Sequence, residues 1–204
     1  MAERDIRIVL IKGSVRPGNY TSMAAALVVD ELGKQEGVSV EVIDPAGLDL
    51  SPPGLEEGKP DPKRIRKAVQ EATGVVLATP EYHGGFSSTM KLVIENLGFP
   101  SALSGKPVAL LGVAAGSIGA IKSLESLGSV CQHVGAIVMP GPVSVANVRD
   151  VFDEDGNCLV PAVEARVRSV AANLVHYIED NICPRVSLEA FVREKEMAEK
   201  GARM

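Results

Sequence analysis

Residues 6–21 read IRIVLIKGSVRPGNYT, and this stretch decides the fold. Its first six residues are almost wholly apolar and rich in β-branched side chains, which is typical of a parallel strand buried on both faces. The glycines Gly13 and Gly18 then mark a loop, and apolar side chains recur at helical spacing over residues 22–32. The stretch therefore predicts a buried strand, a short loop and a helix, which together begin an alternating α/β chain.

The same alternation continues along the chain. Apolar, β-branched segments predict further strands at residues 38–43, 75–79, 108–113 and 136–139. Helical periodicity predicts helices at residues 63–72, 87–97, 118–131 and 162–181, whereas the proline- and glycine-rich residues 44–62 predict an irregular loop. Each crossover between parallel strands is right-handed and must cover one face of the sheet. We therefore expect a flavodoxin-like, doubly wound α/β sheet of five parallel strands in the order 2-1-3-4-5.

The end of the chain differs from the alternating part. Cys183 and Pro184 follow the last long helix, and residues 188–204 form a charged segment of helical composition. We therefore expect one domain over residues 1–182 and a C-terminal helical extension over residues 183–204.

Composition narrows the classes of function. The chain has 204 residues, of which 46% are hydrophobic, and a formal net charge of -5, so neither disorder nor nucleic-acid binding is expected. No apolar run approaches the roughly 18 residues of a membrane span, and residues 1–12 lack the pattern of a secretory signal. The three cysteines are odd in number and far apart, which predicts neither a disulfide framework nor a metal site. We expect a cytoplasmic protein that binds a small molecule, without a nucleic-acid or membrane partner.

The first loop has the composition of an anion site. Residues 13–21 place hydroxyl side chains and Arg16 between a buried strand and the start of a helix, where free N–H groups and the helix dipole favour phosphate. The lysine of a Walker loop is missing after Gly18, and Val15 replaces the middle glycine of a dinucleotide fingerprint. These two differences disfavour a nucleoside triphosphate and a dinucleotide, so a single terminal phosphate is the anion that we expect at this loop. The alternative is a solvated turn in which Ser14 and Thr21 only cap the helix.

A second loop follows the third predicted strand. Residues 80–85 read PEYHGG and lie beside the first loop in the order 2-1-3-4-5, at the switch point where such sheets bind ligands. Backbone N–H groups of a glycine-containing loop can donate hydrogen bonds to a ligand at this point. Tyr82 either stacks on that ligand or packs as an ordinary tyrosine, and His83 is either a hydrogen-bonding loop residue or a proton donor.

The G-S-x-R loop, the P-E-Y-H-G loop and the following helix with Lys91 resemble the NADPH-dependent FMN reductase family, which includes quinone, azo-dye and chromate reductases. The resemblance covers residues 6–177 and implies FMN as the cofactor. It places the FMN phosphate on the first loop, the edge of the ring on the second, and a third contact on the loop after the fourth strand. The implied cofactor-binding residues are Ser14, Arg16, Asn19, Tyr20, Thr21, Pro80, Glu81, Tyr82, His83, Gly84, Ala114, Gly116 and Ser117.

The resemblance also implies the activity. NADPH or NADH reduces FMN, and a small acceptor such as flavin, a quinone, an azo compound or chromate is then reduced at the same site, in ping-pong order. No side chain is expected to be catalytic, because the cofactor carries the chemistry. A homodimer or homotetramer is implied as well. The alternative function is a flavodoxin-type FMN electron carrier, against which the lack of tryptophan and the modest negative charge argue.

Overall fold

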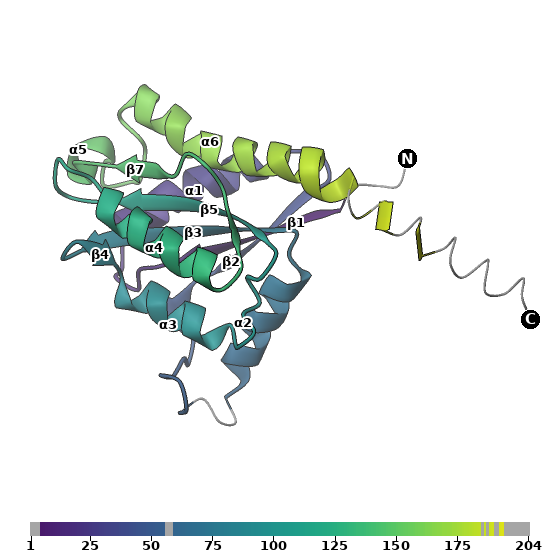
Figure 1. Ribbon diagram of the computed structural model, residues 1–204. Helices are drawn as coiled ribbons and strands as arrows, with labels where there is room; N and C mark the ends of the chain where they lie inside the picture. Colours follow the sequence, from purple (N-terminus) through teal and green to yellow (C-terminus); the bar gives the residue numbers. More distant parts are fainter. Residues whose placement is uncertain (1–4, 56–58, 185, 187, 190–191, 194–204) are drawn as a thin grey trace, which may run out of the picture.

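The computed structural model describes residues 5–55 and 59–184, together with residues 186, 188, 189, 192 and 193. It contains one sheet with helices on both faces (Figure 1). The path through the sheet runs β2-β1-β3-β5-β6, which corresponds to the predicted order 2-1-3-4-5 when these parallel strands are counted along the chain. Their bounds are β1 (Ile6–Lys12), β2 (Val38–Ile43), β3 (Gly74–Tyr82), β5 (Pro107–Val113) and β6 (Ile137–Val138).

Two short strands are additional to the five that the sequence predicts. β4 (Gly85–Phe86) pairs antiparallel with the end of β3, so β3 continues three residues beyond its predicted end. β7 (Val143–Val145) pairs in parallel with the carboxyl half of β5, whereas β6 pairs with its first two residues. β6 and β7 therefore share one side of β5. The prolines at 140 and 142 separate them, because proline has no N–H group for the ladder.

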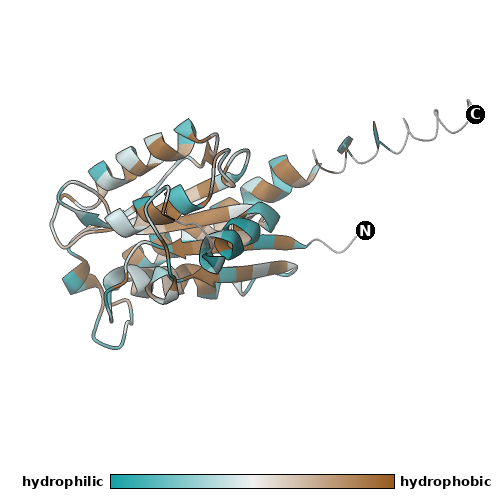
Figure 2. Cartoon of the chain, turned by 90° about the horizontal axis from the view of Figure 1, so that it is seen from below, coloured by the Kyte–Doolittle hydropathy of each residue, from teal (hydrophilic) through white to brown (hydrophobic). Residues whose placement is uncertain are grey.

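The helices cover the two faces of the sheet. On β1, Ile8 and Leu10 enter the core formed with α1 and α6, whereas Val9 and Ile11 enter the core formed with α2, α3 and α4. Alternate side chains of a strand point to opposite faces, so an apolar run over β1 fills both cores. Figure 2 shows the same apolar sheet between helices whose outer surfaces are more hydrophilic. The helices are α1 (Tyr20–Leu32), α2 (Pro60–Glu71), α3 (Ser88–Asn96), α4 (Ile121–His133), α5 (Val148–Val151) and α6 (Pro161–Tyr177).

Several helix boundaries differ from the prediction. α1 begins two residues earlier, because Asn19 caps its first turn. α2 begins at Pro60, so the predicted irregular loop 44–62 ends in a helix, and a 3-10 turn occupies Pro45–Gly47. α4 begins three residues later than predicted, and α5 was not predicted. α6 ends in a π-helical turn, Ile178–Ile182.

The C-terminal segment is helical, as predicted, where the structure describes it, but Cys183 and Pro184, which were predicted to follow the last long helix, are helical as well. Residues 183, 184, 186, 188, 189, 192 and 193 are helical. Residues 185, 187, 190, 191 and 194–204 of the predicted extension lie outside the described residues. Within the described part of the chain, no helix has the length and apolar character needed to cross a membrane.

Candidate functional site

The loop after β1 lies directly against β3. Gly13 donates its N–H group to the carbonyl oxygen of Ala78 at 2.7 Å. A Cβ atom at Gly13 would lie 3.0 Å from the Ala78 carbonyl oxygen and 3.1 Å from the Thr79 Cα atom. Both of these neighbours are backbone, which cannot move aside easily. Glycine at position 13 therefore lets the first loop leave β1 in contact with its neighbour in the sheet.

The loop then turns into α1 with donors left free. The Asn19 side chain accepts a hydrogen bond from the Ser22 N–H group at 2.8 Å and donates one to the Arg16 carbonyl oxygen at 2.6 Å. Asn19 is thus the helix cap, and the alternative in which Ser14 and Thr21 serve only as caps is wrong. Within the described residues, the N–H groups of Tyr20 and Thr21 have no hydrogen-bond acceptor. Free N–H groups at the start of a helix form an anion site.

The loop after β3 is a tight hairpin. His83 and Gly84 join β3 to β4, and both have positive φ angles, of 52° and 78°. Two such residues in succession are the requirement of a type I′ turn, which favours Asn or Asp followed by Gly. Histidine is among the side chains that adopt this conformation more often than most. Glu81 strengthens the turn, because its carboxylate accepts a hydrogen bond from the Gly84 N–H group.

The loop after β5 is anchored to the end of β7. The Ala114 N–H group donates to the Val145 carbonyl oxygen at 2.9 Å, and the Val148 N–H group donates to the Ala114 carbonyl oxygen at 3.0 Å. The Asn147 N–H group donates to the Gly116 carbonyl oxygen at 3.2 Å. These bonds place α5, with its exposed Arg149, beside the third loop.

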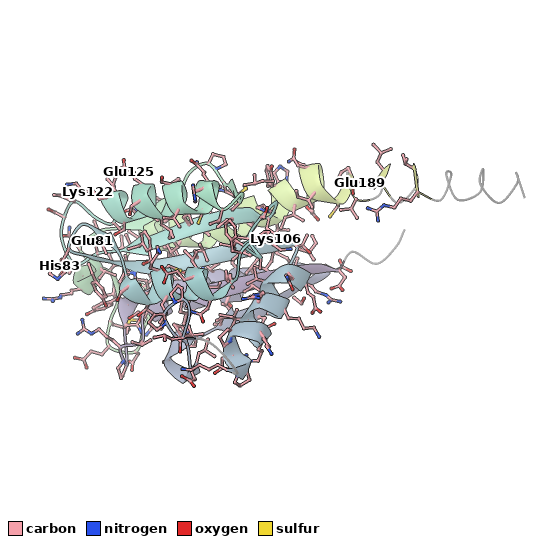
Figure 3. All side chains as sticks on the ribbon, turned by 60° about the horizontal axis from the view of Figure 1, so that its bottom comes forward. Glu81, His83, Lys106, Lys122, Glu125 and Glu189 are labelled. Atoms are coloured by element: carbon pink, nitrogen blue, oxygen red, sulfur yellow. The ribbon has the colours of Figure 1, made fainter. Side chains whose placement is uncertain are left out.

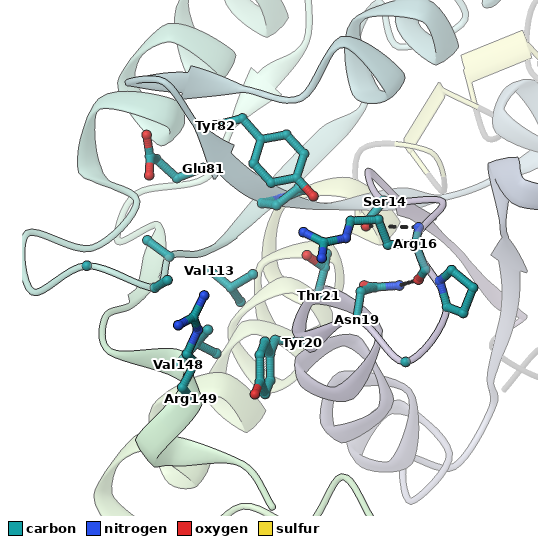
Figure 4. Close-up of a pocket in the computed structure, with 16 residues that line it drawn as sticks. Ser14, Arg16, Asn19, Tyr20, Thr21, Glu81, Tyr82, Val113, Val148 and Arg149 are labelled. Carbon is teal, nitrogen blue, oxygen red and sulfur yellow. Dashed lines mark hydrogen bonds between the residues drawn. The ribbon is translucent and has the colours of Figure 1, made fainter. Parts of the chain in front are cut away.

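The three loops and α5 enclose one cavity of about 300 Å³ (Figure 4). It opens at the carboxyl ends of the strands, at the end of the sheet where Figure 3 shows Glu81 and His83, and away from Lys106. Ser14 and Thr21 are buried in its wall, with 3% and 1% of their surfaces exposed. The lining residues are Ser14, Arg16, Pro17, Gly18, Asn19, Tyr20, Thr21, Pro80, Glu81, Tyr82, Val113, Ala114, Ala115, Gly116, Val148 and Arg149.

Comparison with known proteins assigns this arrangement to a family. A family model described as NADPH-dependent FMN reductase matches residues 6–150, which is more than half of the chain. The chain belongs to the NADPH-dependent FMN reductase family. The resemblance stated from the two loops is thereby confirmed, and with it the oxidoreductase class and the cofactors, FMN and a reduced nicotinamide nucleotide.

Individual relatives agree with this family. The chain is 32% identical to an NADPH azoreductase of a Bacillus species over 177 residues, covering 85% of this chain and 96% of that protein. It is 28% identical to an NAD(P)H-dependent FMN reductase of Pseudomonas aeruginosa over 167 residues, covering 76% of this chain and 85% of that protein.

Solved structures confirm the fold. The structure of a flavoenzyme NAD(P)H:acceptor oxidoreductase of Paracoccus denitrificans superposes with a TM-score of 0.71 at 20% identity, over 86% of this chain and 98% of that chain. An archaeal flavodoxin superposes with a TM-score of 0.58 at 17% identity, over 84% of this chain and all of that chain. The predicted flavodoxin-like architecture is therefore confirmed.

This FMN reductase family member has a cavity whose walls fit FMN. The free N–H groups of Tyr20 and Thr21, the buried hydroxyl groups and Arg16 suit one terminal phosphate. Val113, Ala114 and Val148 give the remaining wall an apolar character that suits a flexible chain and a ring. The volume lies at the lower end of ligand pockets, about 300 to 1,000 Å³, which suits a ligand with one face left open. Among the described residues, no group of three or more His, Cys, Asp or Glu side chains could hold a metal ion.

The structure brings most of the predicted cofactor-binding residues into this cavity and leaves three out of its wall. His83, Gly84 and Ser117 belong to the same loops but do not line it. For His83 the structure supplies a backbone reason for its place in the loop, since position 83 needs a positive φ angle.

Some other residues that line the cavity were not among the predicted cofactor-binding residues. Pro17 and Gly18 could have been found by their place inside the first loop. Val148 and Arg149 carry no such signal, because they follow the third loop by some thirty residues and α5 has four residues. The pairing of β7 with β5 is what brings them to the site.

Proposed function

We propose that this member of the family transfers electrons from NADPH or NADH to flavin or to another small acceptor, such as a quinone, an azo compound or chromate. The observation that carries the proposal is the convergence of three strand-end loops on one open cavity in a chain of the NADPH-dependent FMN reductase family. Donor and acceptor use that single opening in turn, which predicts ping-pong kinetics.

The first loop is the proposed phosphate site. Ser14, Asn19 and Thr21 surround the start of α1, and the Tyr20 and Thr21 N–H groups stand ready as donors. Arg16 adds a planar cation on the same loop, without a partner among the described residues. Phosphate carries about two negative charges near neutral pH, so donors and a guanidinium together stabilise it more than either alone.

The second and third loops are the proposed ring site. Pro80, Glu81 and Tyr82 line one side of the cavity, and the hairpin formed by His83 and Gly84 fixes their backbone. Ala114 contributes no hydroxyl group, so the backbone N–H group of Gly116, which lines the cavity, is the proposed donor of the third loop. When bound, FMN supplies the acceptance and release of hydride, and the chain's own groups orient it.

No side chain in the cavity is assigned a catalytic role. Among the described residues that line it, Glu81 is the one carboxylate, and it accepts a hydrogen bond from the Gly84 N–H group. Catalysis is proposed to rest on positioning, which holds reacting atoms about 3 to 3.5 Å apart. Tyr82 is 41% exposed at the rim and is proposed to shield one side of the ring from water.

The competing function is an electron carrier of the flavodoxin type. The archaeal flavodoxin shares the fold, but the family model and the more similar relatives are reductases. A carrier requires no reduction by a nicotinamide nucleotide. Reduction by NADPH or NADH therefore separates the two functions.

The experiment is an anaerobic titration of the FMN-loaded protein. NADPH or NADH is expected to bleach the visible absorbance of the flavin, and a subsequent quinone or azo dye is expected to restore it. A flavoprotein that neither nucleotide bleaches would favour the carrier, and a colourless protein that takes up no FMN would reject the cofactor site.

A matched pair of variants tests the residues. Arg16→Ala is expected to weaken FMN retention by about tenfold or more, because it removes a charged donor to phosphate. His176→Ala is the control, since His176 lies on α6, outside the cavity, beside Asp180. The reverse pattern would contradict the assignment.

We further propose that the chain is cytoplasmic, that residues 1–182 form the FMN-binding domain with 183–204 as an extension, and that it assembles as a homodimer or homotetramer. Exposed apolar side chains support self-association. They include Phe99, which follows α3 and is 97% exposed, and two residues at the start of α4, Ile118 just before it and Ile121 as its first residue, which are 75% and 51% exposed. Sedimentation equilibrium of the purified chain gives the oligomeric state directly, and a monomer at micromolar concentration would reject this part of the proposal.

A further inference from the structure

The cavity contains a second guanidinium group. Arg149 lines it from α5, whereas Arg16 lines it from the loop after β1, and Figure 4 shows the two side chains entering from different elements. Within the described part of the chain, neither guanidinium has an ion-pair or hydrogen-bond partner. Arg7 and Arg168, by contrast, are paired with carboxylates. Both cavity arginines are therefore available to a ligand.

The backbone beneath Arg149 is fixed. Val148 and Val151, on either side of it, are 3% and 5% exposed and belong to the core under α1 and α6. The Asn147 N–H group donates a hydrogen bond to the Gly116 carbonyl oxygen, and the Val148 N–H group donates one to the Ala114 carbonyl oxygen. The backbone of Arg149 is therefore held in place and bonded to the third loop. A side chain on such a fixed backbone can distinguish between ligands, because it does not move to accommodate each of them.

One phosphate does not need both arginines. The proposed FMN phosphate lies at the start of α1, where free N–H groups, hydroxyl groups and Arg16 already surround it. Arg149 lies on the wall formed by α5, beside the third loop and not in the first. A planar guanidinium there is suited to a second phosphate, which it can bind through two parallel N–H bonds.

The electron donor is a source of such a second phosphate. Quinones are neutral, whereas NADPH and NADH both carry a pyrophosphate and NADPH carries a 2′-phosphate in addition. We propose that Arg149 is a specificity-determining residue that binds a phosphate group of the nicotinamide nucleotide. This inference rests on the proposed function and assigns a residue of α5 to the nucleotide.

Binding of two unreactive nucleotides to the FMN-loaded protein tests the assignment by calorimetry. 2′-Phospho-ADP-ribose carries the pyrophosphate and the 2′-phosphate, and ADP-ribose carries the pyrophosphate alone. Arg149→Gln is expected to weaken binding of 2′-phospho-ADP-ribose by about tenfold, as loss of a charge-assisted bond to phosphate does. If the 2′-phosphate is the partner, the affinity for ADP-ribose stays at the wild-type value. If the pyrophosphate is the partner, affinity for both nucleotides falls. Either result supports the proposal.

A control variant separates contact from general charge. Lys122→Gln removes one positive charge from an exposed position on α4, at the same end of the sheet, and Lys122 does not line the cavity. It is expected to change nucleotide affinity by less than about twofold, since exposed charges are screened over roughly 10 Å. An equal loss in the two variants would overturn the assignment.

FMN affinity, read from flavin fluorescence, supplies the second control. The dissociation constant of FMN is expected to stay within about twofold in Arg149→Gln. Loss of FMN, unchanged binding of both nucleotides, or a wild-type protein that binds neither nucleotide would each reject the proposal. Failure of the proposed function has a different signature, namely FMN-loaded wild-type protein that NADPH and NADH leave oxidised.

Discussion

The Ser87 hydroxyl group donates a hydrogen bond to the carbonyl oxygen of Gly13, across a separation of 74 residues in the chain. The Ser87 hydroxyl oxygen accepts a hydrogen bond from the Met90 N–H group at 3.0 Å, so Ser87 also caps α3. Ser87 also donates its own N–H group to the Thr79 hydroxyl oxygen at 3.2 Å. One buried serine therefore joins the first loop of the site to the helix that follows the second.

Replacement of Ser87 by alanine is expected to lower the free energy of unfolding by about 2 kcal/mol, because it removes a helix cap and leaves the buried Gly13 carbonyl oxygen without its donor. Urea denaturation measures this loss. FMN affinity is expected to fall with it, since the first loop loses its tie to α3. Ser88→Ala, at the exposed neighbouring position, is the control and is expected to change stability by less than about 0.5 kcal/mol.

Replacement of Gly13 by alanine is expected to cost about 1 to 3 kcal/mol, because the added Cβ atom meets the backbone of β3 at 3.0 to 3.1 Å. Thermal unfolding of the two proteins side by side detects the change. Gly47→Ala is the matched control, since a Cβ atom there meets no atom within 4 Å. Equal stability of the Gly13 and Gly47 variants would contradict the close approach of the first loop to β3.

The conformation of the hairpin predicts opposite results for two substitutions of His83. Asparagine adopts a positive φ angle readily, so His83→Asn is expected to keep wild-type stability. A β-branched side chain does not, and His83→Val is expected to lose about 1 to 2 kcal/mol. Chemical denaturation of both variants gives the comparison. If the two substitutions cost the same, the strain argument for this position is wrong.

Burial is expected to make the Cys131 thiol less reactive than the partly exposed Cys158 thiol. The Cys131 side chain has no exposed surface, and burial raises its pKa to about 12. The thiol is therefore protonated at pH 8, and the thiolate is the reactive form. Mass spectrometry after iodoacetamide treatment is expected to find Cys158, which is partly exposed, modified in the folded protein and Cys131 modified only in urea. Early modification of Cys131 in the native protein would show that α4 opens locally.

Local patterns in the sequence were sufficient to predict the five-strand path of the sheet and two of its loops. The apolar run over β1 shows that both faces are buried, and the common order 2-1-3-4-5 of doubly wound sheets correctly predicts the neighbours of this strand. Residues 13–21 and 80–85 were found for the same reason, since both follow a predicted strand directly. The family resemblance rested on those two loops and was confirmed.

The shortest strands and helices could not be predicted from the pattern of apolar residues. β4 and β7 have two and three residues and α5 has four, too few for a periodicity of 2 or 3.6 residues to be seen. The structure also corrected the start of α1, because a side chain such as Asn19 reveals itself as a cap only by the N–H group that it meets.

The sequence by itself determined the alternation of strands and helices and the glycine-containing loop after the first strand, and it predicted an anion site at residues 13–21, because these depend on neighbours along the chain. Only the tertiary structure decided that Gly13 touches β3, that Ser87 holds Gly13 and that Arg149 lines the cavity. These contacts join residues far apart in the chain, and they depend on how the strands pair and how the two cores pack, which no local pattern specifies.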